Sequence, residues 1–253
     1  MAVRRRASGG RGVYAGGMFV FKSPETTIEP TPRRIRVRLG WTVVADSNRA
    51  LLLNQIGPDG LPTYYIPLED VRPGVLVDES AGRWSVVADG RRAEDAAWRN
   101  DRFTELDGHV TFSWELLDWY EEDERVYLHA RSPYHRVDAL HSSRRVQVFI
   151  EGEEVANSTR PVVLYETYLP PRYYLPFADV RSDLLTASET VTQCPYKGVA
   201  RYFSHPKLAD AAWSYPEPSP EITKIRDLVC FYNERVDLVI DGEPQERPVT
   251  PFT

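Results

Sequence analysis

A cysteine and a lysine three residues apart, Cys194 and Lys197, form the feature of this sequence best suited to chemistry. If the two side chains converge, the ammonium group stabilises the thiolate, which is the nucleophilic form of cysteine. His205 and Asp210 follow downstream and are candidates for a base and for the group that orients it. Alternatively, Cys194 is a small buried residue at a strand end, since free cysteine is among the most buried residue types. We predict Cys194 and Lys197 as the candidate catalytic residues.

Aromatic residues in the same part of the chain suggest a binding site. The candidate ligand-binding residues are Tyr202, Asp210, Trp213 and Tyr215. Aromatic faces stack on planar ligands, and the cation of Lys197 can meet a phosphate or a carboxylate. The same rings could instead form a core cluster, because burial is the default for large aromatic side chains.

No residue pattern predicts a metal ion or a cofactor. His129, His135 and His141 recur every six residues, a spacing that fits neither one helix face nor one strand face. No cysteine or acidic cluster accompanies them, so we expect solvated linker histidines rather than a zinc site. A phosphate-binding loop is also absent from the sequence, since Lys197-Gly198 stands in the reverse order.

An internal repeat shows which elements must position these side chains. The order of the matches is preserved, which favours gene duplication over chance. The longest match has six identities in 18 positions and the strongest, YYIPLEDVR against YYLPFADVR, six in nine. The matching segments are 36–53 with 147–164, 64–72 with 173–181, and 95–98 with 210–213.

Apolar and polar residues alternate with a period of two in both copies, which is typical of half-buried strands. Pro67 and Pro176 each follow a strand and favour a single helical turn there. Only residues 110–123 show helical periodicity over more than about ten residues. The predicted strands are 35–39, 42–45, 50–53, 64–66, 146–150, 162–165 and 173–175, with a hairpin of 228–232 and 236–240.

Together these patterns predict a mostly β protein of two small β-sheet domains with a few short helices. We expect a basic, disordered tail over residues 1–34 and a first, degenerate β domain over 35–126. A linker over 127–144 and a second β domain over 145–253 complete the chain. Met18 is a possible alternative start, which leaves open whether residues 1–17 belong to the native protein.

Five further segments are distinctive: TQCPYKG at 192–198, DAAWSYPEP at 210–218, FYNERVD at 231–237, ANSTR at 156–160 and PYHRVD at 133–138. With these segments the chain resembles domain-of-unknown-function family 427, in which members occur singly and in tandem. The resemblance covers about residue 35 to the C-terminus and implies a compact β fold, the β-tent, in two copies. The first copy departs from the pattern because it has no cysteine, so any activity of these motifs belongs to the second copy.

The family has also been labelled a nucleotidyltransferase, which the residues do not support. Such enzymes commonly use a Gly-Ser dipeptide and paired carboxylates that hold two metal ions. This sequence has no Gly-Ser dipeptide, and its best acidic pair, Asp241 and Glu243, flanks a glycine in a predicted turn.

Charge and hydropathy narrow the possible partners. The net charge is −6, and with residues 1–34 set aside 24 basic and 35 acidic side chains remain. This excess of acidic side chains repels nucleic-acid phosphates. No apolar run reaches the roughly 20 residues of a membrane helix. Only two cysteines occur, which favours a reducing, cytoplasmic location. Neither nucleic acid nor membrane is an expected partner, and the oligomeric state stays open.

Three functions remain. We favour a protein that binds a small polar or anionic ligand in a cleft of the second domain, because aromatic rings and one cation suffice for it. An enzyme that uses Cys194 as nucleophile is the first alternative, and it requires the side chains to converge. A structural or partner-binding protein without chemistry is the second.

Overall fold

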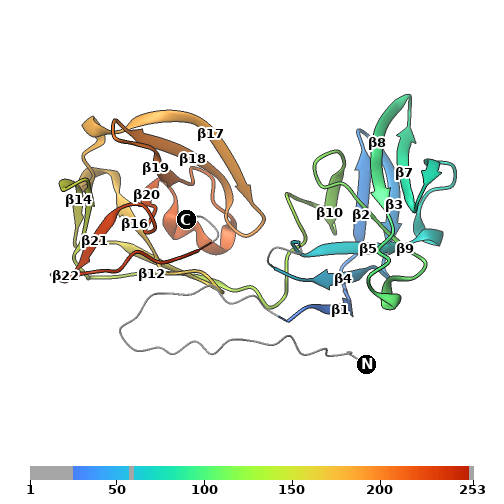
Figure 1. The fold of residues 1–253 in the computed structure, drawn as a ribbon, viewed down its shortest axis with the longest axis horizontal. Coiled ribbons are helices and arrows are strands. Elements are labelled where there is room, and N and C mark those ends of the chain that lie inside the picture. The colour runs from blue at the N-terminus through green and yellow to red at the C-terminus, as the bar shows by residue number, and fades with distance from the viewer. Residues whose placement is uncertain (1–24, 57–59, 251–253) are drawn as a thin grey trace. The chain divides into compact units, whose positions relative to one another are not determined.

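The computed structural model describes residues 25–56 and 60–250, and the chain divides into two compact units. The first unit ends at Ser132 and the second begins at Pro133. Each unit contains one seven-stranded and one four-stranded sheet (Figure 1). The prediction of two tandem, mostly β domains with a few short helices is therefore confirmed. Five of the seven basic residues of the predicted tail, and Met18, lie outside the described residues, whereas Arg33 and Arg34 lie within them.

The first unit is built almost entirely of strands, with two short 3-10 helices. Its elements are β1 (Thr27–Pro30), β2 (Ile35–Leu39), β3 (Thr42–Ser47), β4 (Leu51–Asn54), β5 (Thr63–Pro67), η1 (Leu68–Asp70), β6 (Leu76–Ser80), β7 (Arg83–Ala88), β8 (Arg91–Trp98), η2 (Thr104–Leu106), β9 (His109–Phe112), β10 (Asp118–Glu121) and β11 (Glu124–Val126).

The second unit repeats this order with one additional 3-10 helix, η4. Its elements are β12 (Val137–His141), β13 (Val146–Ile150), β14 (Glu153–Ser158), β15 (Val162–Glu166), β16 (Arg172–Pro176), η3 (Phe177–Asp179), η4 (Ser182–Leu184), β17 (Thr186–Cys194), β18 (Gly198–His205), β19 (Leu208–Ser214), η5 (Pro220–Ile225), β20 (Leu228–Phe231), β21 (Asp237–Ile240) and β22 (Glu243–Pro244).

The large sheets of the two units have the same strand order. It is β1-β4-β5-β9-β8-β7-β6 in the first and β12-β15-β16-β20-β19-β18-β17 in the second. Both copies also shift register at the same place, between Val37 and Arg38 in β2 and between Val148 and Phe149 in β13. Such shifts bend a strand locally, so sharing one points to a common ancestor.

Strands also occur outside the two domain ranges expected from the sequence. Strand β1 lies inside the predicted tail and β12 inside the predicted linker. Each is the edge strand of a large sheet and pairs with the strand that carries the repeat, β4 or β15.

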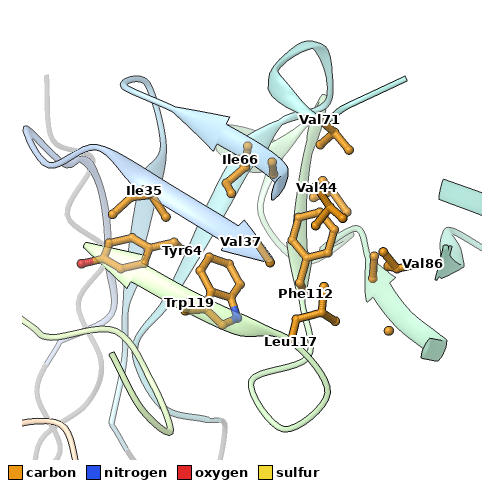
Figure 2. Close-up of a cluster of buried hydrophobic side chains, with 14 of the residues drawn as sticks. Ile35, Val37, Val44, Tyr64, Ile66, Val71, Val86, Phe112, Leu117 and Trp119 are labelled. Carbon is orange, nitrogen blue, oxygen red and sulfur yellow. The ribbon is translucent and has the colours of Figure 1, made fainter. Parts of the chain in front are cut away.

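The core of the first unit lies between its two sheets. Strand β2 buries alternate residues, and from it Ile35 and Val37 point toward side chains of β5, β9 and β10 (Figure 2). Trp119 is almost fully buried, and the ring of Phe112 meets it edge-on at 6.0 Å between centroids. Burial of such rings is a main source of stability in a domain of this size.

Two predictions about local structure are wrong. Residues 228–232 and 236–240 do not form a hairpin, because β20 pairs with β16 and β19 while β21 pairs with β13 of the other sheet. Residues 110–123 form no helix but two strands, β9 and β10. The single helical turns predicted after Pro67 and Pro176 are confirmed as η1 and η3.

Candidate functional site

The hairpin of β17 and β18 differs most between the copies. In the first unit, the hairpin of β6 and β7 has its last residue pair, Ser80–Arg83, next to the turn. Trp84, which pairs with Ala97 of β8, lies one residue after this pair. The equivalent residue Phe203 lies five residues after Gly198. At about 3.3 Å per residue, the second hairpin extends about 13 Å farther. The CPYKG motif occupies this extension, so it has no counterpart in the first copy.

The tip of this hairpin is held in one conformation. Gly198 has a φ of +100°, which L side chains rarely adopt, and a Cβ there would lie 2.8 Å from the carbonyl oxygen of Glu217. The backbone of Ser219 donates to the carbonyl of Lys197 at 3.1 Å, and Lys197 N donates to Cys194 O at 3.3 Å. These backbone contacts fix the position of the Lys197 Cα and therefore the direction in which its side chain leaves the backbone.

Lys197 forms an ion pair with Glu166, at the end of β15, and His135 contacts the same carboxylate. Lys197 Nζ bonds to Glu166 Oε2, and His135 Nε2 lies 3.0 Å from Glu166 Oε1. The three side chains come from three separate segments, yet only 12%, 5% and 8% of Lys197, Glu166 and His135 is exposed. We call these three residues the buried triad.

The ion pair is charged at neutral pH. Burial opposes ionisation of Glu166, but the Lys197 charge and the hydrogen bonds from His135 and Lys197 outweigh it and lower the pKa of Glu166 to about 2. Burial likewise opposes the ammonium, and the Glu166 carboxylate more than compensates, so the pKa of Lys197 is raised. An amine held protonated is neither a base nor a nucleophile, so Lys197 can act only as a fixed positive charge.

Cys194 and several rings adjoin the buried triad. The ring of Tyr196 stacks on His135 with centroids 4.1 Å apart and 22° between the planes. Cys194 is partly exposed and lies close enough to act electrostatically on Lys197 and on Tyr215. In the described part of the chain, no hydrogen bond joins the Cys194 thiol to His135, whose Nδ1 has no partner there.

All three predicted ligand-binding rings belong to a packed cluster. Tyr202, Trp213 and Tyr215 are each at most 8% exposed. Trp213 Nε1 donates to the hydroxyl of Tyr174 at 3.1 Å, and the Trp213 ring contacts Tyr232 at 4.6 Å between centroids. These rings support the site from within the unit, and their faces are occupied by protein neighbours.

A buried ion pair borders this cluster. The guanidinium of Arg172 binds both oxygens of Glu234 at 2.6 Å and lies 5.6 Å from the centroid of the Trp213 ring. Thr250 donates to the same carboxylate at 2.6 Å. Glu234 thus fixes Arg172, and Arg172 in turn fixes the Trp213 ring.

The structure does not bring His205 and Asp210 to Cys194. Strand β18 begins at Gly198, opposite Cys194, and ends at His205, which places the two ends about 23 Å apart at 3.3 Å per residue. Asp210 lies near the His205 end, where it accepts a hydrogen bond from Thr190 at 2.7 Å. A Cys194–His205–Asp210 constellation is therefore wrong.

Sequence reasoning missed two of the three residues of the buried triad. His135 was expected to be a solvated linker histidine, which is wrong because it is buried against Glu166. The repeat did contain a signal for Glu166. At the end of the same apolar strand the first copy has the uncharged Gln55, so the second copy has gained a charge there relative to the first.

Among residues 25–56 and 60–250, no group of three or more His, Cys, Asp and Glu side chains could hold a metal ion. Within the same residues, no helix has the length and apolar character needed to cross a membrane.

Comparison with known proteins identifies the family but no characterised relative. No curated protein matches the chain. A family model described as a domain of unknown function (DUF427) matches residues 27–123 and again residues 138–242, one match in each unit. The chain therefore belongs to the DUF427 family, as a tandem member with two copies of the domain.

Proposed function

We propose that the second unit binds a small polar ligand at the tip of the β17–β18 hairpin, beside Lys197, Glu166 and His135. The partly exposed residues Cys194 and Tyr196 would flank the ligand, and the buried triad would contact its polar groups. The first unit has neither the extended hairpin nor a carboxylate at the position of Glu166, so we assign the ligand to the second unit alone.

One observation carries this proposal: the second copy buries a charged pair that its sister domain does without. Removing a lysine and a glutamate from water costs several kcal/mol per ion, and a hydrophobic pair of similar size is often as stable or more stable. The first copy reaches the same strand order with Gln55 and a short hairpin. A buried charged cluster that the fold does not require is typical of a functional site.

A thermal-shift screen of the full chain tests the proposal. The screen would use polar metabolites from several classes (polyols, nucleosides, amino acids, carboxylates and sugar phosphates), with native mass spectrometry of freshly purified protein in parallel. We expect at least one compound to raise the melting temperature of the wild type but not that of the double variant Glu166→Leu with Lys197→Met. Lys207→Met is the matched control, because Lys207 is 46% exposed and pairs with carboxylates elsewhere in the same unit. Equal stabilisation of all three proteins would contradict the proposed site.

A thiol-dependent enzyme is the second candidate, favoured by the position of Cys194 next to the Lys197 charge. It ranks lower because no hydrogen bond links the thiol to a base in the described part of the protein. Alkylation by iodoacetamide distinguishes the two functions. A Cys194 that reacts no faster than free cysteine at neutral pH argues against the enzyme.

We also propose a cytoplasmic location and no nucleic-acid partner. Both cysteines are free thiols, which suits a reducing compartment. The acidic balance of the two domains disfavours contact with phosphates.

A further inference from the structure

The contacts within the buried triad use only one of the two ring nitrogens of His135. Its Nε2 contacts Glu166 at 3.0 Å, while its Nδ1 is buried and has no hydrogen-bond partner among the described residues. A buried polar atom without a partner costs about 1–3 kcal/mol. Such an atom in a native protein requires an explanation, and a ligand contact is one.

The carboxylate of Glu166 determines which nitrogen of His135 carries the proton. Glu166 is bound to the ammonium of Lys197 and is therefore a carboxylate, which accepts hydrogen bonds but cannot donate them. The nitrogen that faces it, Nε2, must be the donor. In its neutral form the imidazole has a single N–H, so in that form Nδ1 is left with a bare lone pair.

The direction of that lone pair is fixed. Tyr196 stacks on the ring at 4.1 Å, and the Glu166 contact prevents the ring from turning about its axis. A carboxylate that orients an imidazole in this way is the arrangement that hydrolytic triads use to present the opposite nitrogen to a reacting group.

Resting on the proposed ligand site, we infer that His135 Nδ1 accepts a hydrogen bond from an O–H or N–H group of the ligand, which makes the ligand a neutral hydroxyl or amide compound rather than an anion. Two features disfavour an anion. Glu166 already neutralises the charge of Lys197, and a lone pair at Nδ1 repels an anionic oxygen. Among the described residues, Glu166 from β15 and Tyr196 from the hairpin tip contact the imidazole, and Lys197 binds the other oxygen of Glu166.

Nitrogen NMR of the full chain tests the tautomer without any ligand. The protein would carry ¹⁵N only in its five histidines, and His135→Asn would identify the signals of His135. We expect a protonated Nε2 and an unprotonated, pyridine-type Nδ1 at neutral pH. In Glu166→Gln, whose amide can also donate, we expect a mixture of both tautomers. His141, which is exposed, serves as the reference for an unconstrained ring. A protonated Nδ1 in the wild type overturns the inference.

Matched probes then test the class of ligand. Phenol and anisole share a ring but only phenol donates a hydrogen bond, and inorganic phosphate represents an anion. We expect millimolar phenol to shift the Nδ1 resonance of His135 while anisole and phosphate leave it in place. Any other pattern, including no shift with any probe, overturns the assignment of a donor ligand. The two proposals can fail independently. A phosphate or carboxylate that binds only in the presence of Lys197 would support the proposed ligand site but would contradict a neutral donor ligand.

Discussion

Removing one partner of the Lys197–Glu166 pair should destabilise the second unit far more than removing both. Glu166→Gln leaves an ammonium that is only 12% exposed without its counter-charge, and Lys197→Met leaves a carboxylate that is 5% exposed. Breaking a buried pair from one side costs about 3–5 kcal/mol in the free energy of unfolding. When both charges are replaced, in Glu166→Leu with Lys197→Met, no ion remains to be desolvated. The remaining cost is the lost acceptor of His135, about 1–3 kcal/mol. The two substitutions should therefore be coupled by about 3 kcal/mol or more.

Hydrogen exchange of the amides in β15, β16 and β20 measures this quantity in the second unit alone. The exposed pair Arg181–Asp183 provides the control, since its side chains are 57% and 61% exposed and Arg181→Met should leave the free energy of unfolding nearly unchanged. If the single and double variants at the buried pair give additive changes below about 1 kcal/mol, the pair is solvated in solution. The pair would then not mark a functional cluster.

Three further predictions follow from individual groups. The pKa of Glu166 lies at about 2, below the ordinary carboxyl value of 4.5, so its contribution to stability is complete above about pH 4.5 and is lost as the pH falls toward 2. The difference in unfolding free energy between wild type and Glu166→Gln should shrink over that range in acid titrations, and a constant difference would contradict the low pKa. Gly198→Ala combines a strained φ of +100° with a contact 2.8 Å from Glu217 O, and should cost about 1–3 kcal/mol by hydrogen exchange in β17 and β18. Gly152→Ala, at a φ of +80° with no atom within 4 Å, should cost less, and the opposite order would argue against a close-packed tip. Burial raises the pKa of the Cys230 thiol to about 12, so iodoacetamide should label Cys194 first in the native protein and both cysteines after unfolding in urea. Simultaneous labelling in the native state would mean that β20 is not buried as described.

The strands most accurately predicted from the sequence are those with one face buried. Strands β2 and β13 bury every second residue, so their apolar residues alternate and their limits follow from the pattern. Alternation identifies the face of a strand but not its partner. Residues 228–240 illustrate the limit, because the turn after Phe231 carries the chain from the large sheet to the small one and no local signal distinguishes this from a hairpin.

Elements with other patterns were missed or misread. Strand β17 is mostly exposed along its nine residues and therefore shows no apolar alternation. The helical periodicity of residues 110–123 arises where the chain leaves β9 for β10. There Leu117 N bonds to Ser113 O, a single helical turn between two strands. Local spacing could not reveal that the apolar residues on either side belong to different sheets.

The sequence predicted two residues of the candidate site, Cys194 and Lys197, but not Glu166 and His135, and the reason is physical. Cys194 and Lys197 are neighbours in the chain, so their proximity could be inferred from spacing alone. Glu166 and His135 reach Lys197 through the pairing of β12 with β15 and through the extended hairpin, which are contacts between distant segments. Spacing also could not exclude His205, since only the direction of β18 shows that it lies at the far end.

The differences between the two copies are best understood as one change rather than several. A glutamate at the end of β15 is costly in a buried position unless a cation reaches it, and only the extended hairpin supplies Lys197. Conversely, the extension would bury an unpaired ammonium if the first copy's glutamine stood at position 166. Each feature therefore destabilises the domain without the other, so a joint change of both is less costly than a change of either alone. The first copy keeps the strand order without this polar centre, and the second retains a centre that its fold does not need. The proposed ligand site would give this centre a role that the fold alone does not.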